Sequence, residues 1–134
     1  LPRRMRILVA DDNRDSADSL AILLRRSGNE VRTAYDGMAA VAEAESFAPD
    51  VALLDIGLPL LDGYQVAGRI RDLPRGKGVV LVAVTGWGQE QDRRRSRDAG
   101  FNAHLTKPVD SAGLETLLRN LLPADRVAES LSGR

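Results

Sequence analysis

The chain has 134 residues, 43% of them hydrophobic and 28% charged, which suits one domain with a buried core. Its formal net charge is zero, so no global field attracts nucleic acid or an anionic membrane, and it has no cysteine, which excludes disulfides and thiolate metal sites. No apolar stretch approaches the roughly 20 residues of a transmembrane helix, and no secretory signal is evident. We expect a cytoplasmic protein that neither binds nucleic acid directly nor enters a membrane.

Short apolar runs alternate with helical patterns along the whole chain. The predicted elements are a strand over 6–10, a helix over 15–27 that Gly28 ends, a strand over 30–34, a helix over about 37–47, a strand over 50–54, a helix that Asp62 caps, a strand over 79–84, a polar helix over about 89–98, a strand over 102–105, and a last helix that Asp110 caps. The pattern ends after Pro123, so we expect one domain over 1–123 and a C-terminal tail over 124–134.

The predicted strands are continuously apolar rather than alternating. This pattern is typical of strands buried on both faces, as in a parallel sheet covered by helices. Five strand–helix units in succession, joined by right-handed crossovers, predict an open α/β sandwich.

Polar residues follow four of the strands: the pair Asp11-Asp12, then Asp55, Thr85 and Lys107. Ligands of open α/β sheets bind beyond the carboxyl ends of the strands. If the first and third strands are neighbours, the three carboxylates converge, and a divalent cation offsets their repulsion. Ligands that are all oxygen favour Mg²⁺, and a lysine supplies a positive charge for a phosphate.

Asp55 is the candidate nucleophile, because carboxylates can form acyl phosphates. The metal would neutralise charge on the transferring phosphoryl group, while Lys107 would hold another of its oxygens. Gly57 has no side chain, so its carbonyl can approach a metal closely. Each motif alone has a plain structural explanation, such as helix capping by the aspartate pair, but their combination in register favours a phosphorylation site.

Over residues 5–122 the chain resembles the receiver domain of bacterial two-component response regulators. The matching motifs are Val9-Ala10-Asp11-Asp12-Asn13, Leu54-Asp55-Ile56-Gly57-Leu58-Pro59, Leu61-Asp62-Gly63, Val84-Thr85-Gly86 and Thr106-Lys107-Pro108. Each motif is weak alone, but the set is highly specific in this order and spacing.

The resemblance implies a flavodoxin-like fold, with a five-stranded parallel sheet in the order 2-1-3-4-5 and helices on both faces. It implies that Asp55 accepts a phosphoryl group from the phosphohistidine of a histidine kinase or a histidine phosphotransfer domain. Mg²⁺ would be bound by Asp12, Asp55 and the Gly57 carbonyl, with Asp11 acting largely through water. Thr85 would hydrogen-bond the phosphoryl group, and the Lys107-Pro108 peptide bond would be cis.

The same family couples the residue at Thr85 to an aromatic side chain three positions before the lysine, where this chain has His104 in place of the commoner Tyr or Phe. We expect Thr85 and His104 to form the conformational switch, with hydrogen bonding by His104 that varies with pH. Trp87 follows Thr85 by two residues, and we hypothesise that it shields the acyl phosphate from water.

The stretches from Thr85 to Gln89 and from Lys107 to Asp110 are most similar to receivers attached to hybrid sensor histidine kinases. With Leu1 in place of an initiator methionine, this suggests a receiver excised from such a kinase. The alternatives are a stand-alone regulator and a receiver-like interaction module that works without phosphorylation. The sequence leaves the oligomeric state open.

Two enzyme-like or ligand-binding alternatives are less consistent with the motifs. A Mg²⁺-dependent phosphatase of the haloacid-dehalogenase type needs a second acid at the position of Gly57, and a dinucleotide-binding module needs a glycine-rich turn after the first strand. We therefore expect a domain that catalyses its own phosphorylation rather than a turnover enzyme. The arginines of the polar helix (Arg93, Arg94, Arg95 and Arg97) are interpreted as a solvated helix face rather than a phosphate-binding stripe.

Overall fold

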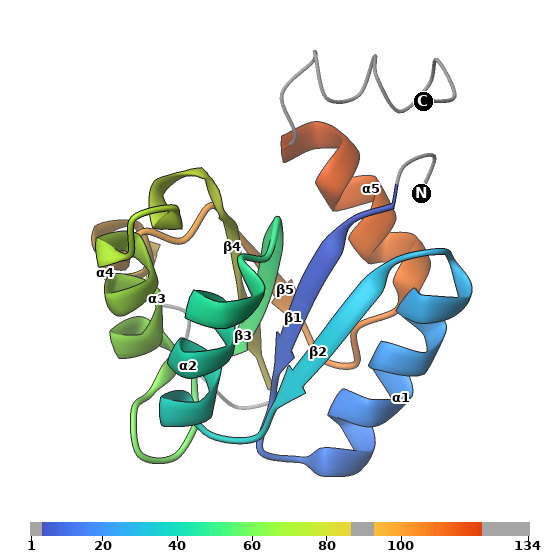
Figure 1. Cartoon of the computed structure of the whole chain (residues 1–134), viewed down its shortest axis with the longest axis horizontal. Helices are drawn as coiled ribbons and strands as arrows, with labels where there is room; N and C mark the ends of the chain where they lie inside the picture. The colour runs from blue at the N-terminus through green and yellow to red at the C-terminus, as the bar shows by residue number, and fades with distance from the viewer. Residues whose placement is uncertain (1–3, 87–92, 122–134) are drawn as a thin grey trace.

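A five-stranded parallel sheet lies between two layers of helices (Figure 1). The computed structural model describes residues 4–86 and 93–121. In chain order its elements are β1 (Arg6–Ala10), α1 (Arg14–Arg26), β2 (Glu30–Ala34), α2 (Gly37–Phe47), β3 (Val51–Asp55), α3 (Gly63–Asp72), the 3₁₀ turn η1 (Gly76–Gly78), β4 (Val80–Thr85), α4 (Arg93–Ala99), β5 (Ala103–Thr106) and α5 (Ser111–Leu121). The strand order is β2-β1-β3-β4-β5, which confirms the predicted sheet.

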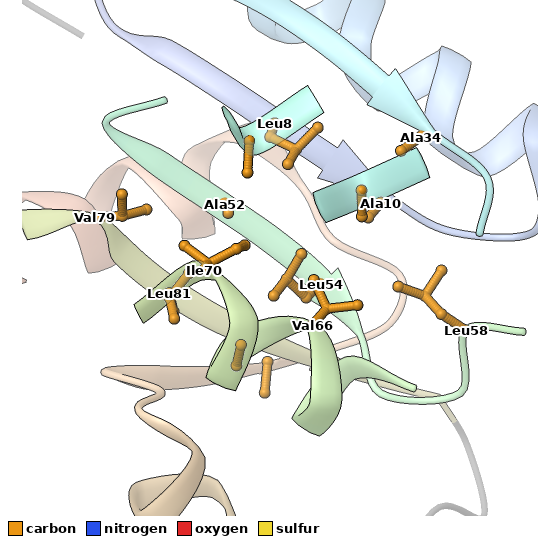
Figure 2. Packing of buried hydrophobic residues seen from close by; sticks show 14 of the residues in the cluster. Leu8, Ala10, Ala34, Ala52, Leu54, Leu58, Val66, Ile70, Val79 and Leu81 are labelled. Atoms are coloured by element: carbon orange, nitrogen blue, oxygen red, sulfur yellow. The ribbon is translucent and has the colours of Figure 1, made fainter. Parts of the chain in front are cut away.

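Each face of the sheet has its own hydrophobic core. Helices α1 and α5 cover one face, where Ile7 and Leu53 point, and α2, α3 and α4 cover the other. On this second face Leu54 and Leu81 pack against Val66 and Ile70 of α3 (Figure 2). Side chains alternate between faces along a strand, so one continuous apolar run supplies both cores.

The three central strands are buried as the sequence predicts, whereas the two edge strands are not. Every residue of β3 and β4 is buried, and so is every residue of β1 after Arg6. The edge strands β2 and β5 contain exposed or half-buried positions. An edge strand has a neighbour on one side only, and charged residues there discourage pairing with other chains.

The element boundaries differ from the sequence prediction by about one residue in several places. Strands β3, β4 and β5 begin and end one position later than expected, so Asp55 and Thr85 are the last residues of their strands. Helix α1 runs over Arg14–Arg26 rather than 15–27, because Asn13 is its N-cap and accepts a hydrogen bond from the Ser16 amide. The described part of the polar helix is Arg93–Ala99; residues 89–92 lie outside the described residues.

The predicted helix caps are confirmed. Asp62 forms a capping box with Gln65, in which each side chain accepts a hydrogen bond from the other residue's amide. Gly28 follows α1 with φ +95°, a conformation that glycine adopts without steric cost. Asp110 accepts a hydrogen bond of 2.5 Å from the Gly113 amide at the start of α5.

Among the described residues no helix has the length and apolarity to cross a lipid bilayer. The last described helix ends at Leu121, and the expected tail over 124–134 lies outside the described residues.

Candidate functional site

The three predicted carboxylates meet at the carboxyl edge of the sheet. Strands β1 and β3 are parallel neighbours with Ala10 opposite Leu54, so the residue that follows β1 lies beside the last residue of β3. Asp11, Asp12 and Asp55 each offer an oxygen, and these oxygens lie within 4.8 Å of one another. Asp55 and Asp11 are buried, whereas Asp12 is exposed. The condition stated from the sequence, that the first and third strands be neighbours, is therefore met.

Lys107 binds two of these carboxylates. Its Nζ donates a hydrogen bond of 2.8 Å to Asp55 Oδ2 and lies 3.2 Å from Asp11 Oδ2. The other oxygen of Asp55 accepts a hydrogen bond of 2.8 Å from the Gly57 amide. Lys107 reaches the cluster from the end of β5, where its amide bonds the Thr85 carbonyl at 2.9 Å and its peptide bond to Pro108 is cis. The cis bond that the family resemblance implies is present.

The electrostatics of the cluster appear in the pKa values of two of its members. Burial raises the pKa of Asp11 and the charge of Asp55 adds to this, although the Asn13 amide and Lys107 act in the opposite direction. Burial acts to lower the pKa of Lys107, but the hydrogen bond and charge of Asp55, together with Asp11, outweigh it and raise that pKa. Lys107 is therefore firmly protonated at neutral pH, while the charged form of Asp11 is disfavoured.

The donor set fits a hard divalent cation. Three carboxylates face a single ammonium group, which leaves an excess of negative charge in a partly buried site. The ligand atoms are all oxygen, as Mg²⁺ and Ca²⁺ require, and exposed Asp12 leaves room for the waters that Mg²⁺ retains. Asp11, Asp12 and Asp55 are the carboxylates that the structure brings together to hold such an ion.

The start of α3 comes close to Asp55 because Gly63 carries no side chain. A Cβ on Gly63 would lie 2.7 Å from the Asp55 carbonyl oxygen, so a larger residue there would displace the start of α3 from the site. Leu60, in the loop between β3 and α3, is 75% exposed and has φ +71°, which is unusual for a residue with a Cβ.

The two expected switch residues lie on one face of the sheet, on neighbouring strands. Thr85 ends β4 and is 2% exposed; in the β4–β5 register it is opposite Thr106, and Ala83 is opposite His104. Because side chains alternate along strands, Thr85 and His104 point to the same face, the face that α4 covers. Trp87, which we expected to shield an acyl phosphate, lies outside the described residues.

Sequence reasoning missed one residue beside the switch. Ser96 of α4 is 1% exposed, and its Oγ lies 2.8 Å from His104 Nε2. Its only sequence signal is a small polar residue between Arg95 and Arg97. The arginines of α4 are exposed, as expected, and Arg95 lies over the Tyr64 ring at 4.1 Å and pairs with Asp62 at 3.5 Å.

Comparison with known sequences identifies one family over most of the chain. A sequence model of the response regulator receiver domain matches residues 7–119. An uncharacterized 14.6 kDa protein of Leptolyngbya boryana is 36% identical over 116 residues, which are 87% of this chain and 88% of that protein. The response regulator PleD of Caulobacter vibrioides is 34% identical over 129 residues, which are 96% of this chain but 28% of PleD. The chain thus spans a minor part of some relatives and most of others.

Solved structures agree with this result. The receiver domain of a sensor histidine kinase from Pseudomonas aeruginosa, which holds a magnesium ion in its active-site cleft, is 34% identical, with a TM-score of 0.77 over 88% of this chain and 97% of that domain. The chemotaxis response regulator CheY4 of Vibrio cholerae has a TM-score of 0.80 at 24% identity, covering 90% of this chain and 100% of CheY4, and this likeness concerns the fold alone.

Proposed function

This chain belongs to the response regulator receiver domain family, the phosphoacceptor domains of two-component signalling, and on that premise we propose that Asp55 is the residue that accepts the phosphoryl group. The observation that carries the proposal is the position of the Asp55 carboxylate, which is 3% exposed and held between the Gly57 amide and the Lys107 ammonium group. The same carboxylate is one of the three that lie within reach of a single cation.

The phosphoryl donor in this proposal is a phosphohistidine of a histidine kinase or a histidine phosphotransfer domain. An oxygen of Asp55 attacks the phosphorus, the phosphorus–nitrogen bond breaks, and its electron pair leaves with the donor imidazole, so that an acyl phosphate forms on Asp55. Lys107 lies near enough to Asp55 to hold an oxygen of the transferred group. Thr85, at the end of the neighbouring strand, supplies a hydroxyl on the same edge.

Asp12, Asp55 and the Gly57 carbonyl are the proposed Mg²⁺ ligands, with Asp11 acting largely through water. The bound ion would supply positive charge against the transferring phosphoryl group. The oxygen-only donor set supports this part of the proposal, as does the magnesium ion in the related sensor-kinase receiver. By the same family relationship, Thr85 and His104 form the switch that responds to phosphorylation.

A second part of the proposal concerns the kind of full-length protein to which this receiver domain belongs. We infer a hybrid sensor histidine kinase, supported by the 34% identity with the Pseudomonas aeruginosa sensor-kinase receiver. A stand-alone regulator has comparable support, since the chain spans 88% of its 14.6 kDa relative. Phosphotransfer rates measured with an isolated phosphorylated histidine phosphotransfer domain and with an autophosphorylated kinase core as donors would separate the two. Faster exchange with the phosphotransfer domain is expected for a hybrid-kinase receiver.

Intact-mass spectrometry tests the central claim. The chain is incubated with Mg²⁺ and a small phosphodonor such as acetyl phosphate, beside Asp55→Asn and an EDTA control. We expect the wild-type chain to gain the mass of one phosphoryl group, and we expect no gain in Asp55→Asn or in the presence of EDTA. Asp62→Asn is the matched control, because it makes the same chemical change close to the site at a helix cap where asparagine is equally suitable. A mass gain that persists in Asp55→Asn would contradict the proposal.

A further inference from the structure

A polar contact joins the described part of helix α4 to the sheet beneath it. Ser96 is the buried residue of its described part, Arg93–Ala99, and the arginines around it are exposed. The Ser96 hydroxyl contacts His104 Nε2 on β5 at 2.8 Å. In the described part of the chain no buried side-chain nitrogen or oxygen lacks a hydrogen-bond partner, and for the Ser96 hydroxyl His104 supplies one.

The contact lies between the proposed phosphorylation site and α4. His104 is opposite Ala83 on β4, two residues before Thr85, and all three side chains point to the same face of the sheet. A change at Thr85 therefore reaches His104 through adjacent positions on neighbouring strands. His104 in turn reaches α4 through Ser96.

An imidazole at this position can hydrogen-bond a serine hydroxyl, which a phenyl ring cannot do. A neutral imidazole has one donor and one acceptor nitrogen, so it can pair with a serine hydroxyl in either direction. Burial lowers the pKa of His104, and the charge of Arg93, also on α4, lowers it further, so the ring is neutral at neutral pH. A phenylalanine would fill a similar space but offer the Ser96 hydroxyl no hydrogen-bonding group.

We propose that Ser96 is the positioning residue for His104: its hydroxyl holds the imidazole against α4, and breaking this hydrogen bond when Asp55 is phosphorylated releases the helix. The release step rests on the proposed function. Its physical basis is that a buried hydroxyl deprived of its partner is costly. The described part of α4 also packs half-buried Ala99 against the core and Arg95 over the Tyr64 ring, so these contacts must adjust when the helix moves. The helix must then shift until the hydroxyl finds water or another partner.

The first test measures the tautomer populations of the His104 imidazole in the unphosphorylated chain. His104 is the single histidine of the chain, so its ring nitrogens give unambiguous NMR signals. We expect the tautomer populations of His104 to differ between the wild-type chain and Ser96→Ala, because the variant lacks the hydroxyl that bonds Nε2. Thr116→Ala is the matched control, because it removes an exposed hydroxyl that bonds within α5, and it should leave the tautomer unchanged. An identical tautomer population in Ser96→Ala and wild type would overturn the positioning role.

The second test follows amide hydrogen exchange in α4 together with intact mass. Without a phosphodonor, Ser96→Ala should exchange on the order of five- to tenfold faster than wild type in α4, with α5 unchanged. Phosphorylation should accelerate α4 exchange in the wild type and add much less in Ser96→Ala. A mass gain with no change in α4 exchange would overturn this inference alone, whereas no mass gain would overturn the proposed function and the release step together.

A second variant keeps the test decisive if Ser96→Ala does not fold. His104→Phe removes the same hydrogen bond from the other side and keeps a ring of similar bulk on β5. It should also accelerate α4 exchange relative to the wild type. If α4 exchanges as slowly in His104→Phe as in the wild type, the hydrogen bond does not hold the helix.

Discussion

At the scale of single residues, the conformation of Leu60 stands out beside the site. Its side chain is 75% exposed and its φ is +71°, in the left-handed region where a Cβ approaches the carbonyl oxygen. Because the Leu60 side chain is exposed, it contributes little to the core that could offset this strain. The neighbouring close contact, in which a Cβ on Gly37 would lie 2.0 Å from the Leu61 carbonyl oxygen, shows how tightly the loop is held against α2.

Relief of that strain should stabilise the domain. Asparagine adopts positive φ more readily than leucine, so Leu60→Asn should raise the free energy of unfolding by about 0.5–1 kcal/mol, measured by urea denaturation. Leu60→Ala keeps the Cβ and should show no comparable gain. Equal stabilities for all three chains would mean that the loop conformation carries no strain.

His104 should make stability depend on pH. Its pKa in the folded protein is below the ordinary 6.5, so the unfolded chain binds the proton more tightly and protonation favours unfolding. The stabilising contribution of the neutral ring is complete above pH 6.5 and falls as the pH drops from 6.5 towards the folded-state pKa. His104→Gln does not titrate, so the difference in unfolding free energy between it and the wild type should change over that pH range. A constant difference would contradict the shift.

At the scale of elements, one side chain joins three separate segments. The Arg71 guanidinium at the end of α3 donates to the carbonyls of Gly76 and Val79, at 2.7 Å each, and to the Gly100 carbonyl at 2.6 Å. It also donates a hydrogen bond of 2.9 Å to Asn102 Oδ1. The same oxygen accepts a hydrogen bond from the Leu81 amide. Arg71 therefore ties the start of β4 and the connection between α4 and β5 to α3.

Removal of this guanidinium should destabilise the whole domain. Arg71→Ala leaves several partly buried carbonyls without a donor, and we expect a loss of at least about 2 kcal/mol in the free energy of unfolding by urea denaturation. Arg71→Lys should recover little, because an ammonium group cannot span the planar set of acceptors. Arg69→Ala on the same helix removes an exposed arginine and serves as the control. A loss as small as that of Arg69→Ala would contradict this role.

The elements also show which features the sequence could reveal. The apolar runs and the caps at Asp62 and Asp110 predicted the elements, because these signals are local. The roles of Arg71 and Ser96 were not predictable in the same way. Arg71 acts on residues up to 31 positions away, and Ser96 of α4 interacts with His104 on another element, β5, so neither partner is visible in the local pattern.

At the scale of the molecule, the sheet topology creates a site that no single segment contains. The carboxylates follow or end two strands, β1 and β3, that are adjacent in space but separated by α1, β2 and α2 in the chain, and the lysine follows the edge strand β5. The individual residues could be selected from the sequence because parallel strands end at one edge. Their distances, and the sharing of Lys107 between Asp11 and Asp55, depend on the register of four strands.

The whole fold should therefore be stabilised by the ion proposed at this edge. The three carboxylates are brought together in the folded chain only, since unfolding separates them. Mg²⁺ that binds the folded state alone should raise the free energy of unfolding by about 2.7 kcal/mol at roughly 100 times its dissociation constant, measured as a shift of the thermal midpoint against EDTA.

Substitution at the exposed ligand separates this effect from a general influence of salt. Asp12→Asn removes one proposed ligand without disturbing a buried contact, so the Mg²⁺-dependent shift should shrink or vanish while the midpoint in EDTA stays the same or rises. Asp98→Asn, an exposed change on α4, should keep the full shift. An equal Mg²⁺-dependent shift of the thermal midpoint in the wild type, Asp12→Asn and Asp98→Asn would mean that the ion acts elsewhere. An ion bound at the carboxylate cluster must lose affinity when Asp12 is replaced, and the stability that it adds to the sheet must fall with that affinity.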